Sequence, residues 1–367
     1  MEPLKNNISP QYVSEIADSL VCHVEGFDKQ NFLDRIVPRL GNYELKERVQ
    51  LITDCLYDVL PCDTGERNRV LREILWPTNS NGKPAIWGWS ILPFNGVIGQ
   101  HGTNRFEESL TLLKDLTERF SSEFDVRYYL LKDQKAALAI MQNWICDPNE
   151  HIRRLVSEGT RPRLPWAMQL PALIEDPSPV LPLLEQLRDD SAEYVRRSVA
   201  NHLNDIAKDH PDLVANLASR WMIDADNNRK RLLKHACRTL IKNGHQTALE
   251  VFGFKSPSID VFRLSVETQR VQFGKDVAFS AILGSDSSDS QLLVIDYVIH
   301  FLKNNGKQAA KVFKWKSLTL NPGETIEISR SHPIKPITTR RYYPGTQGIS
   351  LRINGQDFGN ADFELMM

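Results

Sequence analysis

Cysteine is scarce and scattered in this 367-residue sequence. The five cysteines are odd in number and form no CxxC pair, which disfavours a disulfide framework and favours a reducing compartment. Cys55 and Cys62 have a spacing that could begin an iron–sulfur site, but no further cysteine pair follows to complete it. We therefore predict a cytoplasmic protein that holds neither a disulfide nor a cluster.

Long apolar runs are also missing. No stretch of about 18 apolar residues occurs, and the opening segment MEPLKNNISP has no apolar leader, so no membrane association is predicted. Walker, GxGxxG, HExxH and GxSxG motifs are absent, and the nine histidines show no metal-ligand spacing. The sequence therefore predicts neither a metal nor a cofactor.

Neither sign of charge is in excess. The chain carries 45 lysines and arginines against 46 acidic residues, which gives a net charge of −1. Overall charge therefore provides no argument for nucleic-acid binding, and a DNA-binding face would have to come from local clusters. The hydrophobic content of 41% is ordinary for a globular protein with a substantial core.

Most of the chain has the spacing of helices. Apolar residues recur at helical intervals within residues 1–75, and helix is expected again from about Asn104 into the 240s. The segment 76–103 is rich in Gly, Pro and Trp and is predicted to be a structured loop. Residues 1–255 are therefore predicted to be one mainly α-helical domain.

The composition changes after Lys255. A short polar linker leads into apolar–polar alternation, with turn-forming clusters between the runs. Short β-rich runs at this spacing are typical of an all-β sandwich of immunoglobulin-like type. Residues 257–367 are predicted to form this domain, which contains no cysteine for an inter-sheet disulfide.

An internal repeat runs through the helical part. Segments 123–127, 150–154 and 193–197 each place a glutamate four residues before an arginine. Their irregular spacing suits HEAT-like helix pairs, which bury their apolar faces by stacking into a solenoid. Each Glu–Arg pair could be a surface ion pair within one helix, or its arginine could meet DNA phosphates.

Basic side chains gather at three places that the inner face of such a solenoid could present. Spaced cations suit a DNA backbone, where released counterions supply the affinity, although a solvated helix face is the plainer alternative. The predicted DNA-binding residues are Arg153, Arg154, Arg161, Arg163, Arg196, Arg197, Asn201, Arg231 and Lys234.

The helix predicted from Ala192 to Lys208 has two unlike sides. Valine, leucine and isoleucine recur on one stripe at helical spacing and should pack in the core. Arg197, Asn201 and Asp205 fall on the opposite, polar side. In a solenoid that side would face the concave groove.

The segment 155–179 is the most unusual. Glu158 should lie near the end of a helix, and the prolines that follow should hold an extended connection with Trp166 at its end. A carboxylate near a helix C-terminus is electrostatically unfavourable, which hints at a cationic partner for Glu158. The alternative is a buried tryptophan that joins two repeats, beside a glutamate without a special role.

The stretch 150–214 contains SEGTRPRLPWA followed by EYVRRSVANHLNDIAKDHPDLV, and it closely resembles the alkylpurine DNA glycosylases of the AlkC type. The resemblance covers most of the chain, including the C-terminal domain that some members carry. It implies a monofunctional glycosylase for 3-methyladenine and 3-methylcytosine in double-stranded DNA, without deep base flipping. It also implies Glu158, Asp205 and Glu123 as active-site carboxylates and Trp166 as the aromatic residue at the lesion.

These residue types suit that chemistry. A base methylated at N3 is cationic, so its leaving group needs no protonation, and its departure leaves an oxocarbenium-like sugar. Fixed negative charge and a positioned water are what a protein can add, and an aromatic face adds cation–π attraction. The alternatives are a non-catalytic HEAT-repeat scaffold that binds DNA or a protein partner, and a protein that binds damaged DNA without excising the base.

The protein is expected to be a monomer.

Overall fold

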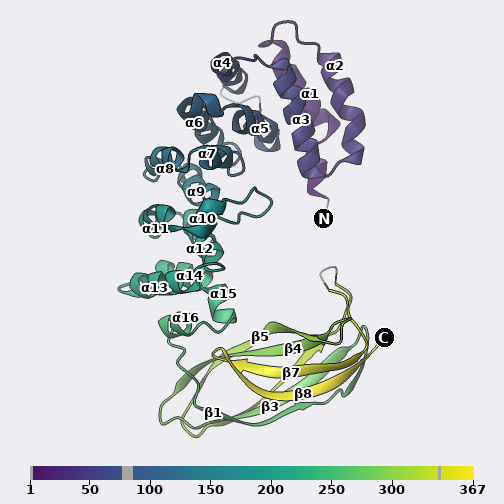
Figure 1. Cartoon of the computed structure of the whole chain (residues 1–367), viewed down its shortest axis with the longest axis vertical. Helices are drawn as coiled ribbons and strands as arrows, with labels where there is room; N and C mark the ends of the chain where they lie inside the picture. Colours follow the sequence, from purple (N-terminus) through teal and green to yellow (C-terminus); the bar gives the residue numbers. More distant parts are fainter. Residues whose placement is uncertain (1–2, 77–85, 338–339) are drawn as a thin grey trace. The chain divides into compact units, whose positions relative to one another are not determined.

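The computed structural model describes residues 3–76, 86–337 and 340–367. These residues form a long series of helices followed by two β-sheets, as the change in composition predicts (Figure 1). Contacts divide the chain into two compact units, Met1–Asp209 and His210–Met367. No helix in the described ranges is long and apolar enough to cross a membrane.

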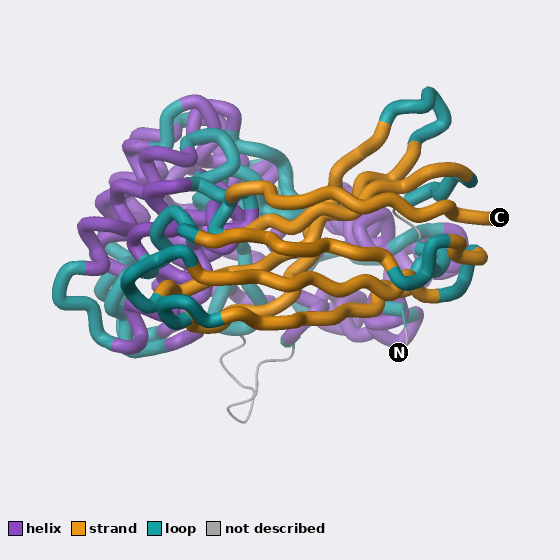
Figure 2. The backbone as a smooth tube through the Cα atoms, turned by 90° about the horizontal axis from the view of Figure 1, so that it is seen from below, coloured by secondary structure: helices purple, strands orange, loops and turns teal. Residues whose placement is uncertain are grey.

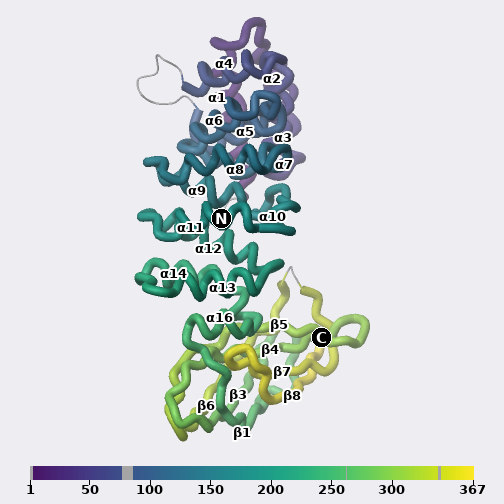
Figure 3. The backbone as a smooth tube through the Cα atoms, turned by 60° about the vertical axis from the view of Figure 1, so that its left-hand side comes forward, coloured from purple at the N-terminus to yellow at the C-terminus, as the bar shows by residue number. Residues whose placement is uncertain are grey.

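The first unit is built from helices that succeed one another in layers (Figure 3). They are α1 (Pro10–Val21), α2 (Lys29–Ile36), α3 (Leu45–Val59), α4 (Thr64–Leu75), α5 (Ile91–His101), α6 (Phe106–Leu116), α7 (Val126–Lys132), α8 (Gln134–Gln142), α9 (Glu150–Gly159), α10 (Pro171–Glu175), α11 (Leu181–Leu187) and α12 (Glu193–Ile206). Helices from successive pairs pack on each other, as α9 does on α12 and α3 on α5. The predicted HEAT-like solenoid is confirmed.

Local sequence signals place many of the helix starts. Polar side chains accept a hydrogen bond from the first turn and so satisfy a main-chain N–H that has no partner inside the helix. Such caps are Ser9 before α1, Asp28 before α2, Asp63 before α4, Asp133 before α8 and Asn149 before α9.

Helix α5 corrects the prediction of a structured loop over 76–103, of which 77–85 lie outside the described residues. Pro93 lies in the first turn, where its missing N–H costs no helical hydrogen bond. At Gly99 an added Cβ would lie 2.9 Å from the Cβ of Asp125, closer than packed side chains come. Gly99 therefore serves close helix packing and Pro93 is compatible with the start of the helix, and the prediction was wrong because both were taken as turn signals.

The second unit begins with four helices and continues as a sandwich of two sheets. The helices are α13 (Pro211–Met222), α14 (Asn227–Ala236), α15 (Arg238–Lys242) and α16 (Gln246–Val251). The strands are β1 (Ile259–Val266), β2 (Arg270–Gln272), β3 (Asp276–Ser285), β4 (Gln291–Leu302), β5 (Gln308–Leu320), β6 (Thr325–Pro333), β7 (Gly345–Ile353) and β8 (Gln356–Met366).

One sheet has the strand order β1-β3-β6 and the other β2-β8-β7-β4-β5 (Figure 2). All pairings are antiparallel except that of β2 with β8. The apolar side chains of the two sheets form one core, with Phe279 of β3 and Tyr297 of β4 at a ring distance of 5.1 Å. The predicted immunoglobulin-like sandwich is confirmed.

Two glycines join the helices of this unit to its sandwich. Gly244, before α16, and Gly355, between β7 and β8, both have positive φ. A Cβ at Gly244 would lie 2.5 Å from the Cα of Gly355, so neither position tolerates a side chain without movement of the backbone. Nearby, Asn354 Nδ2 donates to the main-chain oxygen of Lys255 at 2.8 Å. The region around α16 is therefore fixed to the sandwich by a close backbone contact and by a side-chain hydrogen bond.

Candidate active site

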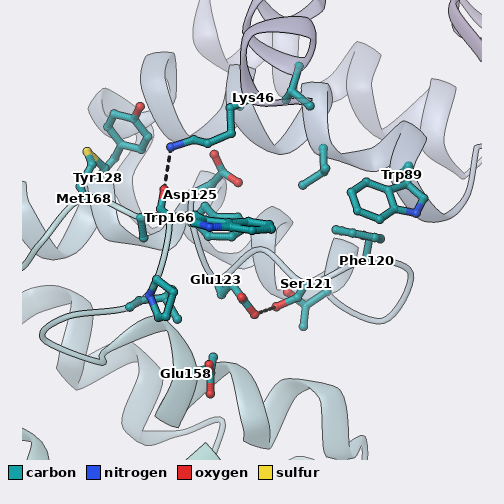
Figure 4. A pocket seen from close by; sticks show the side chains of 18 of the residues that line it. Lys46, Trp89, Phe120, Ser121, Glu123, Asp125, Tyr128, Glu158, Trp166 and Met168 are labelled. Carbon is teal, nitrogen blue, oxygen red and sulfur yellow. Dashed lines mark hydrogen bonds between the residues drawn. The ribbon is translucent and has the colours of Figure 1, made fainter. Parts of the chain in front are cut away.

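A cavity of about 770 Å³ opens in the first unit and brings together aromatic and carboxylic side chains (Figure 4). Its walls come from α3, α5, α7 with the segment 117–125 before it, α9, the start of α12 and the loop 160–170 between α9 and α10. Three of the four predicted catalytic residues line it, namely Glu123, Glu158 and Trp166. The fourth, Asp205 of α12, is joined to this group through Arg161.

The loop 160–170 is a compact series of turns and not the extended connection that its prolines predict. Main-chain hydrogen bonds run from Ala167 N to Leu164 O at 3.2 Å and from Leu170 N to Pro162 O at 3.1 Å. Proline fixes only its own φ and restricts its predecessor, so it is as compatible with a turn as with an extended chain. The prediction of an extended connection was wrong for that reason.

Trp166 lies at the turn of this loop and projects into the cavity (Figure 4). Its side chain is 63% exposed, so it is not a buried tryptophan that joins two repeats. Its φ of 67° lies in the left-handed region, which a bulky residue rarely adopts. Lys46 of α3 donates from Nζ to the main-chain oxygen of Trp166 at 2.6 Å.

Arg127 of α7 holds the same loop from inside. Its side chain is fully buried and donates to the main-chain oxygens of Gly159, Arg161 and Met168 at 2.9, 2.8 and 2.7 Å. Burial, with a smaller contribution from nearby Arg161, lowers the pKa of Arg127 to about 10, which still leaves it charged at neutral pH. This arginine belongs to the repeat detected in the sequence, but it fixes the loop instead of forming a surface pair with Glu123.

Arg161 links the two predicted catalytic carboxylates. Its Nη1 donates to Glu158 Oε1 at 2.6 Å, and its Nε donates to Asp205 Oδ2 at 2.8 Å. Both carboxylates are buried, and Lys208 also donates to Asp205 at 2.9 Å. Asp205 was expected on the polar side of its helix, and the structure buries this one residue of that side under Arg161. The predicted DNA-binding residue Arg161 is thus an internal partner of the site.

Glu123 has an arginine partner from another repeat. Arg154 of α9 donates to Glu123 and lies 3.5 Å from Glu158 Oε1, so it joins these two carboxylates. Ser121 Oγ also donates to Glu123, at 2.8 Å. Glu123, the glutamate of one repeat, is therefore bonded to the arginine of the next repeat.

Two buried polar side chains of α12 form hydrogen bonds with Glu158 and with its neighbour Ser157. Ser198 of α12 donates from Oγ to Glu158 Oε2 at 2.6 Å. His202, one turn further along α12, contacts the main-chain oxygen of Ser157 through Nδ1 at 2.9 Å. His202 is fully buried, and this burial lowers its pKa to about 4, so its ring is neutral at physiological pH. Sequence analysis did not identify these two residues, because the core face of α12 contains them.

Asp125 is a cavity residue that the sequence analysis missed. Its side chain is 7% exposed and lines the cavity beside Glu123. Burial, with a contribution from Glu123, raises its pKa to about 8. Its position directly before α7 gave it the appearance of an ordinary helix cap, yet its side chain makes no capping hydrogen bond.

Several predicted DNA-binding arginines have partners inside the protein. Arg153 forms two hydrogen bonds with Asp190, at 2.6 and 2.9 Å. Arg163 forms two with Asp209, at 2.8 and 2.9 Å. Arg196 donates to main-chain oxygens at the start of α12, including that of Ser191 at 2.8 Å. These side chains stabilise the helical repeats in the protein without DNA.

The remaining predicted DNA-binding residues differ in exposure. Arg197 is exposed on α12, and Asn201 is half-buried. In the second unit, Arg231 and Lys234 are exposed on α14 and line a shallow cavity with Lys230. Over the described ranges, no cluster of His, Cys, Asp and Glu side chains is arranged to hold a metal ion.

Comparison with known proteins agrees with this combination of a helical solenoid, an acidic and aromatic cavity and a β-sandwich. Residues 115–240 match the family model described as DNA alkylation repair enzyme, and residues 260–367 match the C-terminal Ig-like domain of the uncharacterised protein YhaZ. The chain is 38% identical to YhaZ of Bacillus subtilis (strain 168) over 362 residues, which cover 96% of this chain and 98% of YhaZ.

A solved structure is similar over the full length. The alkylpurine DNA glycosylase AlkC of Pseudomonas fluorescens, bound to DNA containing an abasic site analogue, matches with a TM-score of 0.88 at 35% identity. The match covers 100% of both chains. Fold and site together define a helical-repeat protein with a C-terminal immunoglobulin-like domain. The chain belongs to the DNA alkylation repair enzyme family, as an AlkC-like member.

Proposed function

We propose that this protein is a monofunctional DNA glycosylase that hydrolyses the N-glycosidic bond of cationic N3-methylated bases in duplex DNA. Its substrates are 3-methyladenine and 3-methylcytosine. The observation that carries the proposal is the convergence of Glu158 and Asp205 on Arg161, in the wall of a cavity that the exposed ring of Trp166 also lines. Similarity to an alkylpurine DNA glycosylase bound to DNA supports the same reaction class.

The carboxylates suit a reaction in which positive charge moves from base to sugar. As the glycosidic bond breaks, the methylated base leaves neutral and the sugar becomes oxocarbenium-like. Carboxylates that are already held in place stabilise that charge without reorganisation, and one of them can orient the attacking water. Arg161 offsets their charge in the free protein, which permits two carboxylates to be buried together.

Trp166 suits recognition without deep base flipping. Its ring projects from a loop that is fixed by Arg127 and Lys46, so it can approach a lesion from the protein side. An aromatic face attracts a cationic base by up to about 2 kcal/mol when water is excluded. Leaving the base in the duplex avoids an extrusion cost of a few kcal/mol.

The exposed cations Arg197, Arg231 and Lys234 are the proposed contacts to the DNA backbone. Phosphate contacts supply affinity that does not depend on sequence and that falls with salt. Arginines that already have acidic or main-chain partners, such as Arg153, are proposed instead to stabilise the repeats.

Base release tests the proposed function directly. DNA is methylated as single strands, in which cytosine N3 is accessible, and is then annealed to a duplex. Purified protein is incubated with this duplex, and the released bases are separated by chromatography. We expect release of 3-methyladenine and 3-methylcytosine above the spontaneous rate. The Glu158→Gln protein, prepared in the same way, controls for a contaminating glycosylase. Release no faster than the spontaneous rate would rule out the glycosylase.

A further inference from the structure

The cavity extends beyond the predicted catalytic residues and is large enough to hold a small molecule. Its volume of about 770 Å³ lies within the range of about 300–1,000 Å³ that is typical of small-molecule sites. Beyond Glu123 and Glu158 it extends along α5 and α7 to Asp125 and Tyr128. Figure 4 shows the Asp125 carboxyl on one side of the Trp166 ring and Glu123 on the other side in this view.

Asp125 differs from the other carboxyl groups of the site in having no partner. Glu123, Glu158 and Asp205 each accept a hydrogen bond from an arginine. The Asp125 side chain, although more than nine-tenths buried, forms no hydrogen bond or ion pair with any residue in the described ranges. The carboxyl oxygens of Asp125 are not sealed from solvent within the described residues, so they face the open cavity, where a ligand can take the place of water.

The packing of α5 fixes this carboxyl in the cavity wall. A Cβ at Gly99 would lie 2.9 Å from the Cβ of Asp125 and 3.0 Å from the Tyr128 ring. The absence of a side chain at Gly99 thus lets α5 lie directly behind both residues. Tyr128 and Trp166 contribute aromatic surface to the same cavity, and Met168 contributes a polarisable one.

The charge state of Asp125 determines which ligand fits. Burial raises its pKa to about 8, so the carboxyl is protonated at neutral pH. A protonated carboxyl offers one donor and one acceptor side by side. An aminopurine presents the complementary pair along one edge, an amino N–H next to a ring nitrogen, which asparagine and glutamine side chains recognise in DNA.

We propose that the part of the cavity lined by Asp125, Tyr128 and Trp166 is a binding site for the released methylated base, whose amino-bearing edge pairs with the Asp125 carboxyl. The ligand class is a neutral, free aminopurine, with 3-methyladenine as the leading member. The site takes up the base after the glycosidic bond has broken, so it does not require the base to be flipped beforehand. This inference rests on the proposed function for the origin of the base, but binding itself requires no DNA.

Titration of the DNA-free protein with 3-methyladenine, followed by calorimetry at pH 7, tests the site. We expect saturable binding that weakens about tenfold or more in Asp125→Leu, because a bidentate hydrogen-bonded pair is lost. Asp125→Asn, which keeps one donor and one acceptor at the same size, should bind as the unsubstituted protein does. The N6,N6-dimethyl derivative of 3-methyladenine keeps the N3 methyl group but has no N–H donor, and it should bind the unsubstituted protein about tenfold or more weakly than 3-methyladenine.

Three results would overturn the inference: no saturable binding to the unsubstituted protein, equal binding by Asp125→Leu, or equal binding of the dimethylated base. Loss of binding in Asp125→Asn, with a thermal transition like that of the unsubstituted protein, would also overturn it, since the proposed pairing does not need a carboxylate. Because none of these titrations contains DNA, they are independent of base release. A protein that binds 3-methyladenine but excises nothing would contradict the proposed function alone.

Discussion

Lys46 Nζ and the main-chain oxygen of Trp166 are 2.6 Å apart, and this bond joins α3 to the loop that carries the exposed indole. The backbone of Trp166 is left-handed, a conformation that costs a non-glycine residue on the order of 1–3 kcal/mol. Contacts elsewhere must therefore offset that cost. Lys46 holds the loop from the solvent side, and buried Arg127 holds it from inside.

Replacing Lys46 tests the outer contact. We expect Lys46→Met to slow single-turnover release of 3-methyladenine by about three- to tenfold, since a net hydrogen bond of about 1 kcal/mol is lost and Trp166 is held less firmly. Lys132→Met is the matched control, because Lys132 donates in the same way to the main-chain oxygen of Thr103, away from the cavity. Equal rates for the two variants would show that Lys46 does not position the indole.

Replacing Arg127 tests the inner contact. Arg127→Lys leaves several buried main-chain oxygens without donors, so the free energy of unfolding should fall by roughly 2–4 kcal/mol. Arg48→Lys is the control, since Arg48 is also buried and donates to the main-chain oxygens of Ile8 and Tyr43. Urea unfolding should show similar losses for both variants. Only Arg127→Lys should also slow base release under conditions where both proteins are folded. If both variants released bases more slowly, the slower release would follow from lost stability and not from the position of the Trp166 loop.

The architecture follows from local signals that the sequence carries openly. Helical spacing, side-chain caps and the change to alternation after Lys255 predict a solenoid followed by a sandwich, because each signal acts within a few residues. Helix α5 was missed because Gly99 allows close packing against Asp125, a partner distant in sequence. Composition alone cannot distinguish a glycine that permits packing from one that permits a turn.

The site was predictable in its residue types but not in its pairings. Family resemblance selected Glu158 and Asp205 as candidate catalytic residues, whereas Arg161, which the structure shows as their shared partner, was assigned to DNA. Pairings between repeats depend on how successive helix pairs stack, which the spacing within one repeat does not specify. Asp125 could not be selected from the sequence, since an aspartate before a helix is most often a cap.

Charge removal at the two central carboxylates should disable catalysis without unfolding the protein. Glu158→Gln and Asp205→Asn keep side-chain shape, and each should slow base release by about 10²–10³, the typical cost of losing a preorganised electrostatic group. Because both carboxylates bind Arg161, the double variant should lose less than the product of the two effects. Asp115→Asn, which disturbs the exposed pair with Arg72 away from the cavity, is the control and should release bases normally. Full activity in both site variants would place the active site elsewhere.

Acid should destabilise the protein through His202. The folded protein protonates this histidine only near pH 4, whereas the unfolded chain does so near 6.5. The unfolded chain therefore binds more protons in between, and the free energy of unfolding should fall by about 3 kcal/mol as the pH drops from 6.5 to 4. Urea unfolding of His202→Gln over the same range should show a correspondingly smaller loss. An identical pH dependence in both proteins would mean that His202 is not the group responsible.

Asp125 should lower the free energy of unfolding as the pH rises, whereas His202 lowers it as the pH falls. Its pKa is about 8 in the folded protein and near 3.9 when unfolded, so the folded protein binds more protons between these values. The stability that comes from this proton is fully present below about pH 4 and is lost as the pH rises through 8. Asp125→Asn has no carboxyl to ionise in the cavity, so its free energy of unfolding should decline less than that of the unsubstituted protein between pH 5 and about 8. A decline of equal size would show that Asp125 is ionised in the folded protein at neutral pH, and the pairing proposed for the released base would then lack its donor.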